Sequence, residues 1–236
     1  MKIFVVFGSK SDENVSLPLV ESLRGDFEVE YEVISAHRDL EKLHAKINGW
    51  KGDAIIAGAG LAAALPGVVA AMTPLPVFGV PVPSQFGGLD SLASIAQMPP
   101  GVPVMTAGPA STMPIVDFLK KYKQWKKSKA VHFVTALNHP DLMAEIEKAK
   151  TLGAEKGIAV TASAEMNPDA MNVVVVAKAE DVRKDAFCLH VPFLPKSETQ
   201  NPAAYLPVME WANRGGLWVG VNNTRNAVQS ALRLAA

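Results

Sequence analysis

Cysteine is nearly absent from the sequence, since Cys188 is the single one among 236 residues. One thiol cannot form an internal disulfide, which excludes the small disulfide-stapled folds. Cys188 lies in an apolar run, residues 186–189, that predicts a strand and a buried, unreactive thiol. No two histidines have the spacing of metal ligands, so we expect no metal.

Neither sign of charge is in excess, because 23 Lys and Arg residues balance 23 Asp and Glu residues. Such a chain has no net charge whose electrostatic field would attract nucleic acid or an anionic membrane, and we expect neither as a partner. Six lysines with interleaved aromatic side chains do crowd residues 117–130. Because the rest of the chain balances them, we interpret this segment as a solvated helix face followed by a linker.

Long apolar runs are missing too, so no membrane-spanning helix is predicted. The apolar residues 3–7 directly follow Met1 and Lys2 and are too few for a signal peptide, which predicts a cytoplasmic protein. The chain does have 49% hydrophobic residues, enough for a substantial buried core.

Short apolar runs alternate along the chain with longer segments of helical periodicity. This alternation is typical of an α/β fold, in which helices cover both faces of a parallel sheet. Pro18 falls inside the first helical segment and leaves that helix boundary open. The strands of the first half are predicted at residues 3–7, 28–34, 54–57, 77–80 and 102–105.

The same pattern starts again after the linker. Residues 131–135 resemble an opening strand, and residues 138–141 and 163–165 then fall where the first half has residues 9–12 and 35–37. We interpret this order as an internal tandem duplication, with chance similarity between two α/β units as the alternative. The predicted domains are a catalytic unit (1–112), a helix and linker (113–130), and a diverged second copy (131–236) that carries the final helix.

Three predicted strands of the first half end in small or polar residues. After the first strand come Ser9, Ser11 and Asp12, whose hydroxyls and nearby backbone amides suit an anion, although an ordinary helix cap explains them as well. Gly8 before them is expected to permit a tight turn. Because ligands of open α/β sheets bind at the carboxyl ends of strands, we interpret this corner as part of a binding site.

The second strand leads into Ser35, His37 and Arg38, and the third leads into Gly58 and Gly60. A histidine titrates near neutral pH and an arginine stays charged, so the pair suits proton transfer beside a phosphorylated substrate. The two glycines allow a ligand to approach the backbone, although close helix packing would explain them too. The sequence has neither a P-loop nor a complete dinucleotide fingerprint, so we expect no nucleotide cofactor.

These segments resemble, in the right order, those of the N5-carboxyaminoimidazole ribonucleotide mutases and the related aminoimidazole ribonucleotide carboxylases of purine biosynthesis. The resemblance covers nearly all of residues 1–108. The segments that carry it are GSKSD (8–12), SAHRD (35–39), AGAG (57–60), ALPG (64–67), TPLPVFGVPVPS (73–84) and GLDSLASIAQMP (88–99).

The resemblance implies a three-layer flavodoxin-like fold, no cofactor, and a ribonucleotide and carbon dioxide as small-molecule partners. It places Asp12 on the ribose hydroxyls, Ser9 and Arg38 at the phosphate, and His37 as the proton shuttle. Residues 58–64, with Pro83 and Ser84, would then form the walls of a small apolar pocket for carbon dioxide.

The sequence also departs from the family. Relatives commonly have histidine where this chain has Ala64, and the second copy has Glu165 and Met166 in place of the histidine and arginine. Family members typically form octamers whose sites lie between subunits. A fused pair would occupy two subunit positions, so we expect a homo-oligomer, with a tetramer imitating the octamer.

The leading interpretation is interconversion of N5-carboxyaminoimidazole ribonucleotide and 4-carboxyaminoimidazole ribonucleotide. The nearest alternative is direct carboxylation of aminoimidazole ribonucleotide with carbon dioxide, and a related enzyme acting on a different nucleotide also stays open. A non-catalytic nucleotide-binding paralogue is the alternative from another class, favoured by Ala64 and by the diverged half.

Overall fold

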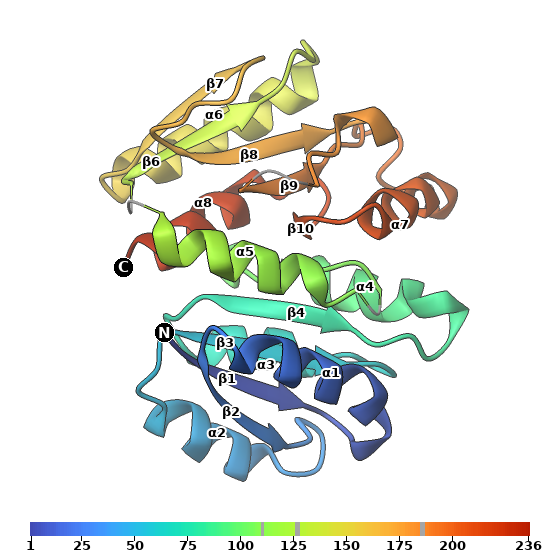
Figure 1. Cartoon of the computed structure of the whole chain (residues 1–236). Coiled ribbons are helices and arrows are strands. Elements are labelled where there is room, and N and C mark those ends of the chain that lie inside the picture. Colours follow the sequence, from blue (N-terminus) through green and yellow to red (C-terminus); the bar gives the residue numbers. More distant parts are fainter. Residues whose placement is uncertain (110, 126–127, 185–186) are drawn as a thin grey trace.

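The protein folds around one large sheet with helices on both faces, as a computed structural model shows (Figure 1). The structure describes residues 1–109, 111–125, 128–184 and 187–236. The predicted α/β class is confirmed. Over the described residues, no helix is long and apolar enough to cross a membrane.

Residues 1–124 contribute the first half of the sheet and its helices. The strands are β1 (Lys2–Phe7), β2 (Glu28–Val33), β3 (Ala54–Ala59), β4 (Val77–Pro81) and β5 (Met105–Thr106). The helices are α1 (Glu13–Arg24), α2 (Leu40–Gly49), α3 (Leu65–Met72), α4 (Leu89–Ala96) and α5 (Met113–Gln124), with short 3-10 turns η1 (Lys10–Asp12) and η2 (Phe86–Gly88).

Residues 130–236 contribute the second half. Its strands are β6 (Ala130–Val134), β7 (Ala159–Ser163), β8 (Met171–Val176), β9 (Cys188–Pro192) and β10 (Leu217–Trp218). Its helices are α6 (Pro140–Glu155), α7 (Leu206–Asn213) and α8 (Thr224–Ala235), with 3-10 turns η3 (Ala179–Asp181) and η4 (Pro202–Tyr205).

The strands follow the order β2-β1-β3-β4-β5-β10-β9-β8-β6-β7. Within each half all the pairings are parallel, and the two halves meet at one antiparallel bridge between Thr106 and Trp218. Counted from its own first strand, each half has the order 2-1-3-4-5. The two segments of the chain therefore build the same strand topology within one continuous sheet.

Alternation along the strands sends side chains to the two faces of the sheet. In β1, Val5 and Phe7 pack in one cluster with α1 and α5, while Phe4 and Val6 pack in another with α2 and α3. The lysine-rich segment is partly helix α5, as predicted for residues 117–124, and residues 126–127 lie outside the described residues. Buried strands of this kind hold the loops that follow them in fixed positions.

The structure corrects one prediction about local structure and answers one open question. The prediction of a strand at residues 102–105 is wrong in its bounds, because the observed strand, β5, consists of Met105 and Thr106. Pro103 has no N–H for a ladder hydrogen bond, and Gly101 before it has a φ of 95°. The open question at Pro18 is answered, because α1 continues through this residue. Proline has no N–H, so one carbonyl oxygen of the preceding turn loses its helical hydrogen bond. Pro18 lies on the exposed side of the helix, where water can solvate that carbonyl oxygen.

Cys188 is 2% exposed at the start of β9, so its predicted burial in a strand is confirmed. Residue 186 of that predicted run lies outside the described residues. Burial raises the pKa of the Cys188 thiol to about 12, because the thiolate would lose its hydration. The thiol is therefore protonated at neutral pH and unreactive.

The halves approach most closely beside the short central strands. A Cβ added to Gly108 would lie 2.5 Å from the carbonyl oxygen of Ala212 in α7, and one added to Gly220 would lie 2.8 Å from that of Ala96 in α4. Asn226 in α8 also reaches across, accepting a hydrogen bond from the amide of Gly101 at 2.9 Å. Glycine is required at both crossings because any side chain would meet backbone.

We expect Gly108→Ala to lower the free energy of unfolding by about 1–3 kcal/mol, because the added methyl group must push α7 away. Gly49→Ala is the matched control, since nothing lies within 4 Å of its added Cβ. The control is expected to leave stability unchanged or to raise it by up to about 1 kcal/mol. Chemical denaturation measures both, and equal effects of the two changes would contradict the close approach of the halves.

Candidate functional site

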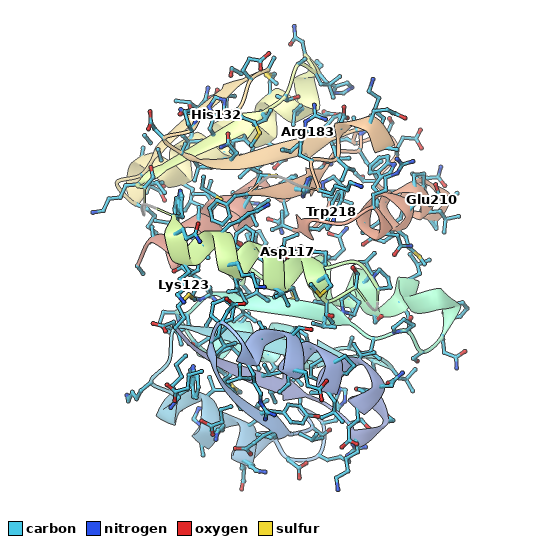
Figure 2. The ribbon with its side chains drawn as sticks, in the orientation of Figure 1. Asp117, Lys123, His132, Arg183, Glu210 and Trp218 are labelled. Atoms are coloured by element: carbon cyan, nitrogen blue, oxygen red, sulfur yellow. The ribbon has the colours of Figure 1, made fainter. Side chains whose placement is uncertain are left out.

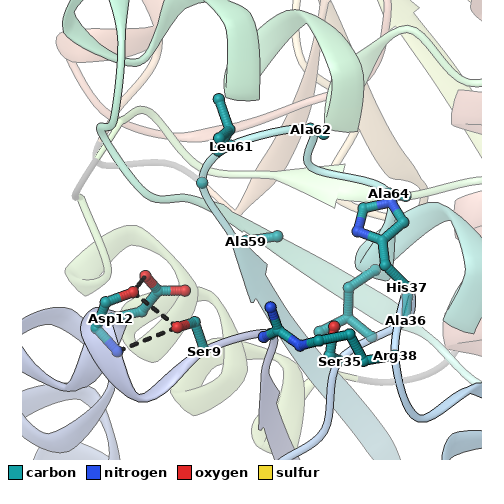
Figure 3. A pocket seen from close by; sticks show the side chains of 14 residues that line it. Ser9, Asp12, Ser35, Ala36, His37, Arg38, Ala59, Leu61, Ala62 and Ala64 are labelled. Atoms are coloured by element: carbon teal, nitrogen blue, oxygen red, sulfur yellow. Dashed lines mark hydrogen bonds between the residues drawn. The ribbon is translucent and has the colours of Figure 1, made fainter.

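A pocket of about 370 Å³ opens where β1, β2 and β3 end. Because β1 lies between β2 and β3, the loops that follow these three strands meet at one edge of the sheet. Figure 3 shows the Ser9–Asp12 turn on one side of this pocket and residues 35–38 on the other. We call it the His37 pocket, and its lining residues are Gly8, Ser9, Ser11, Asp12, Ser35, Ala36, His37, Arg38, Ala59, Gly60, Leu61, Ala62, Ala64 and Leu65.

The turn after β1 is held by its own hydroxyl groups. Ser9 caps η1 by accepting a hydrogen bond from the amide of Ser11 at 3.2 Å, and the Ser11 hydroxyl lies 2.8 Å from that of Ser9. Gly8, which the sequence analysis expects to permit the turn, has no positive φ, and an added Cβ would meet nothing closer than 3.9 Å. The turn therefore does not use the conformational freedom of glycine and is stabilised by the Ser9 cap.

Asp12 is the buried carboxylate of the pocket, with 8% of its surface exposed. Burial raises the pKa of Asp12 above its ordinary value, and the hydrogen bond from the Ser11 hydroxyl at 3.0 Å opposes that rise. The structure therefore places a hydrogen-bond acceptor of raised pKa at the base of the turn. Such a group suits a ligand that brings its own donors, such as a pair of hydroxyls.

The loop after β2 presents a titratable side chain and a cation together. Ser35 is 7% exposed and fixes the loop through its carbonyl oxygen, which accepts a hydrogen bond from the amide of Asp39 at 2.9 Å. His37 and Arg38, the next side chains along, are exposed on the rim of the pocket. Among the described residues that line this pocket, Arg38 is the one permanent cation.

The loop after β3 lines the pocket mostly with glycine and alanine residues, so its backbone is accessible from the pocket. Ala62 has a φ of 49°, a strained conformation for a residue with a side chain, and such strain is found mostly at functional sites. Helix α3 begins just beyond it, and Ala64 at its N-cap offers no side-chain cap. Pro66, the second residue of the helix, has no N–H, so the amides of Leu65 and Gly67 are the ones left without a side-chain cap. The small side chains of this loop leave room for a small group.

Seven of the eight predicted site residues line the pocket; these are Ser9, Ser11, Asp12, Ser35, His37, Arg38 and Gly60. Gly58 does not, because it lies within β3 under the ring of Phe7, and its carbonyl oxygen accepts a hydrogen bond from the amide of Gly8 at 3.1 Å. Pro83 and Ser84, predicted as walls, are not among the lining residues. Gly60 lies near Ser84, since a Cβ added to it would be 3.4 Å from the Cβ of Ser84.

Ala36 and Leu65 line the pocket but are not predicted as site residues. Leu65 is the first residue of α3 and is 2% exposed, and the sequence gives no reason to separate such a leucine from the core. Both residues lie within segments that carry the family resemblance, and this is the signal that could have found them. Over the described part of the chain, no three His, Cys, Asp or Glu residues come together as metal ligands.

The chain was compared with known proteins. The family model for AIR carboxylase matches residues 2–148. The N5-carboxyaminoimidazole ribonucleotide mutase of Pyrococcus abyssi is 54% identical over 113 residues, which is 45% of this chain and 64% of that protein. The proteins of the same name from Methanocaldococcus jannaschii and Saccharolobus solfataricus are 48% and 52% identical, over 45% and 44% of this chain and 68% and 70% of their own lengths. The chain thus spans about two thirds of the length of these relatives.

We expect Asp12→Asn to raise the melting temperature at neutral pH. Because the folded-state pKa of Asp12 is raised, the folded protein favours the protonated acid, and stability falls as the pH rises from the unfolded-state pKa to the folded-state pKa. The difference between variant and wild type should therefore be absent below about pH 4, grow as the pH rises through that interval, and stay constant above the folded-state pKa. Thermal unfolding from pH 3 to 8 measures it, with the exposed Asp39→Asn as control. A melting temperature lowered by Asp12→Asn at neutral pH would contradict the assignment.

Proposed function

The chain belongs to the AIR carboxylase family, whose model matches more than half of it, and we propose from this membership that it acts in purine biosynthesis. The proposed reaction interconverts N5-carboxyaminoimidazole ribonucleotide and 4-carboxyaminoimidazole ribonucleotide in the cytoplasm, without a cofactor. The observation that carries the proposal is the meeting of His37 and Arg38 with Ser9 and Asp12 in one pocket. The names of the relatives support the same reaction.

The proposed binding mode follows from the chemistry of each wall. Arg38 and the Ser9 hydroxyl are the cation and donor that a phosphate monoester requires, so they hold the phosphate. Asp12 accepts hydrogen bonds from the ribose hydroxyls. A pocket of about 370 Å³ is within the usual range for small-molecule sites, although its rim at His37 is open in the single chain.

His37 is the proposed catalytic residue. In its protonated form it donates a proton to the substrate nitrogen as the carbamate C–N bond breaks, which gives carbon dioxide and aminoimidazole ribonucleotide. The ring carbon C4 then attacks the carbon dioxide, and neutral His37 removes the C4 proton once the new C–C bond has formed. The proton that His37 gives up in the first step returns in the second, so the isomerisation needs no net acid or base.

Carbon dioxide must stay near the ring between the two steps. Gly60, Ala62 and Ala64 line the proposed place for it, and their small size leaves room for carbon dioxide. Ala64 occupies the position of the second histidine of the resembling family, which keeps the direct carboxylase as the alternative reaction. A non-catalytic paralogue is less favoured, because pure nucleotide binding gives no reason for His37 on the rim.

We propose further that residues 131–236 are a diverged copy of residues 1–112, joined by the helix and linker of 113–130. The identical strand order of the two halves supports this, and each half ends in a helix, α5 or α8, that follows its fifth strand. Glu165 and Met166 lie in the loop after β7, as His37 and Arg38 lie in the loop after β2. That loop therefore has neither a histidine nor an arginine, and we assign the copy no part in the proposed reaction.

A coupled assay of the purified protein tests the proposed reaction. We expect turnover of N5-carboxyaminoimidazole ribonucleotide, and we expect His37→Asn to reduce kcat by about 10²- to 10⁴-fold, the usual contribution of a general acid–base group. His44→Asn is the matched control, since His44 lies in α2 and does not line the pocket. Bicarbonate-dependent turnover of aminoimidazole ribonucleotide alone would establish the carboxylase instead, and no turnover of either substrate would contradict the proposal.

Homo-oligomerisation is the remaining part of the proposal. His37 and Arg38 are exposed on the pocket rim, and Leu61, in the loop after β3 on another wall of the pocket, is 72% exposed (Figure 3). A second copy that covers Leu61 would also exclude water from the site. We expect sedimentation velocity at micromolar concentration to show a stable oligomer, with a tetramer as the expected size. We expect Leu61→Glu to weaken the oligomer and the catalytic activity together, and a stable wild-type monomer would contradict this part.

A further inference from the structure

A second pocket, of about 460 Å³, lies at the carboxyl ends of β6 and β8, far along the sheet from the His37 pocket. Figure 2 shows Arg183, one of its residues, in the half of the molecule that contains β6 and β8. We call it the Lys178 pocket. Its lining residues are Val134, Thr135, Ala136, Leu137, Ala164, Val174, Val175, Ala177, Lys178, Asp181 and Arg183.

The location is one where α/β sheets bind ligands. Strand β6 lies between β7 and β8, so the chain leaves it towards one neighbour and later returns on the other side. A crevice forms at such a switch in strand order, at the carboxyl ends. Thr135 follows β6, Ala164 follows β7 and Ala177 follows β8, so all three strand ends contribute to the pocket.

The connection from β7 to β8 helps to leave this crevice open. In the first half the corresponding connection contains α2, whereas residues 164–170 form a short loop without a helix. That loop is fixed to the sheet, because His132 lies 2.9 Å from the carbonyl oxygen of Glu165, and Asn172 donates to the carbonyl oxygen of Asn167 at 2.7 Å. The opening is therefore held by specific hydrogen bonds.

The charges of the pocket favour an anion. Lys178 and Arg183 are both on the loop that leaves β8. The nearby Asp181 carboxylate accepts hydrogen bonds from the amides of Ala177 and Lys178 at 2.9 and 3.1 Å, and it thereby fixes the loop that carries the two cations. Two cations and one committed carboxylate leave a net positive charge at the pocket.

The uncharged walls favour a ligand with an organic body. Val134 and Val174 are 7% and 3% exposed and form an apolar floor. The oxygen of the Thr135 hydroxyl accepts from the amide of Leu137 at 3.0 Å, which leaves its proton to donate to a ligand. A ligand that fits must therefore place a compact anion at the cations and carbon atoms on the floor.

We propose that the Lys178 pocket binds an organic phosphate monoester, independently of the His37 pocket. The Arg183 guanidinium, whose Nη1 already donates to the carbonyl oxygen of Glu180 at 3.0 Å, and the Lys178 ammonium match the charge of a phosphate dianion. The pocket binds without turnover, because His132, the histidine nearest in sequence to its β6 wall, is 5% exposed, is hydrogen-bonded to Thr161 and Ser163, and does not line it. The inference concerns the second half of the chain and does not depend on the purine reaction.

Calorimetric titration of the full chain with ribose 5-phosphate tests the proposal, in a variant that already carries Arg38→Gln to weaken the His37 pocket. We expect this variant to keep one binding event, and we expect the further changes Lys178→Gln and Arg183→Gln to weaken that event tenfold or more. Lys156→Gln with Arg214→Gln is the matched control, because it removes two exposed cations outside both pockets.

Two further measurements test the proposal, a titration with inorganic phosphate and the chemical shifts of backbone amides. Inorganic phosphate is expected to bind more weakly than ribose 5-phosphate, because it cannot cover the apolar floor. Chemical-shift changes on ribose 5-phosphate addition are expected at the amides of Thr135 and Ala177. The proposal is overturned if Arg38→Gln alone abolishes binding, if the Lys178 and Arg183 changes leave the affinity unaltered, or if inorganic phosphate binds equally well.

Discussion

The rest of the structure depends on one constraint, which is that the first strand of each half lies between the second and the third strand of that half. Because all strands within a half are parallel, their carboxyl ends share one edge, and the loops after β2, β1 and β3 must meet there. His37 and Asp12 are 25 residues apart in sequence and line one pocket for this reason. The same constraint in the second half produces the Lys178 pocket from β7, β6 and β8.

The two halves are held together by contacts that tolerate no side chain. Strands β5 and β10 have two residues each and share one bridge, so they contribute few hydrogen bonds. The close approach of Gly108 to α7 and of Gly220 to α4 brings backbone into contact on both sides of that bridge. Asn226 adds hydrogen bonds from α8 to the loop before β5, including one to the carbonyl oxygen of Pro99 at 3.0 Å. A structural role for the second half therefore rests on specific packing against the first.

Much of the first half could be predicted from its sequence, because the information there is local. Apolar runs mark the buried strands, and the residues after each strand mark the pocket, as His37 and Ser9 show. Gly58 and Gly60 show the limit of such reasoning, since the two lie on the same strand end and only the contact of Phe7 with Gly58 excludes that glycine from the pocket. The turn after Gly8 forms without a positive φ because the Ser9 hydroxyl caps it, which composition does not reveal.

The remaining features depend on contacts between distant residues. The sequence does not indicate that the halves share one sheet, because the pairing of Thr106 with Trp218 joins residues more than a hundred positions apart. The Lys178 pocket has no motif either, since Thr135 and Arg183 are brought together only by the order of β6 and β8. Neither feature can be read from periodicity or propensity, which describe neighbours along the chain.

A crystal structure with 4-carboxyaminoimidazole ribonucleotide bound tests the central claim most directly. The account predicts the phosphate between Ser9 and Arg38, the ribose hydroxyls at Asp12, and the ring carbon that carries the carboxylate within hydrogen-bond reach of His37, about 3 Å. A nucleotide whose ring points away from His37, or one found only in the Lys178 pocket, would contradict it.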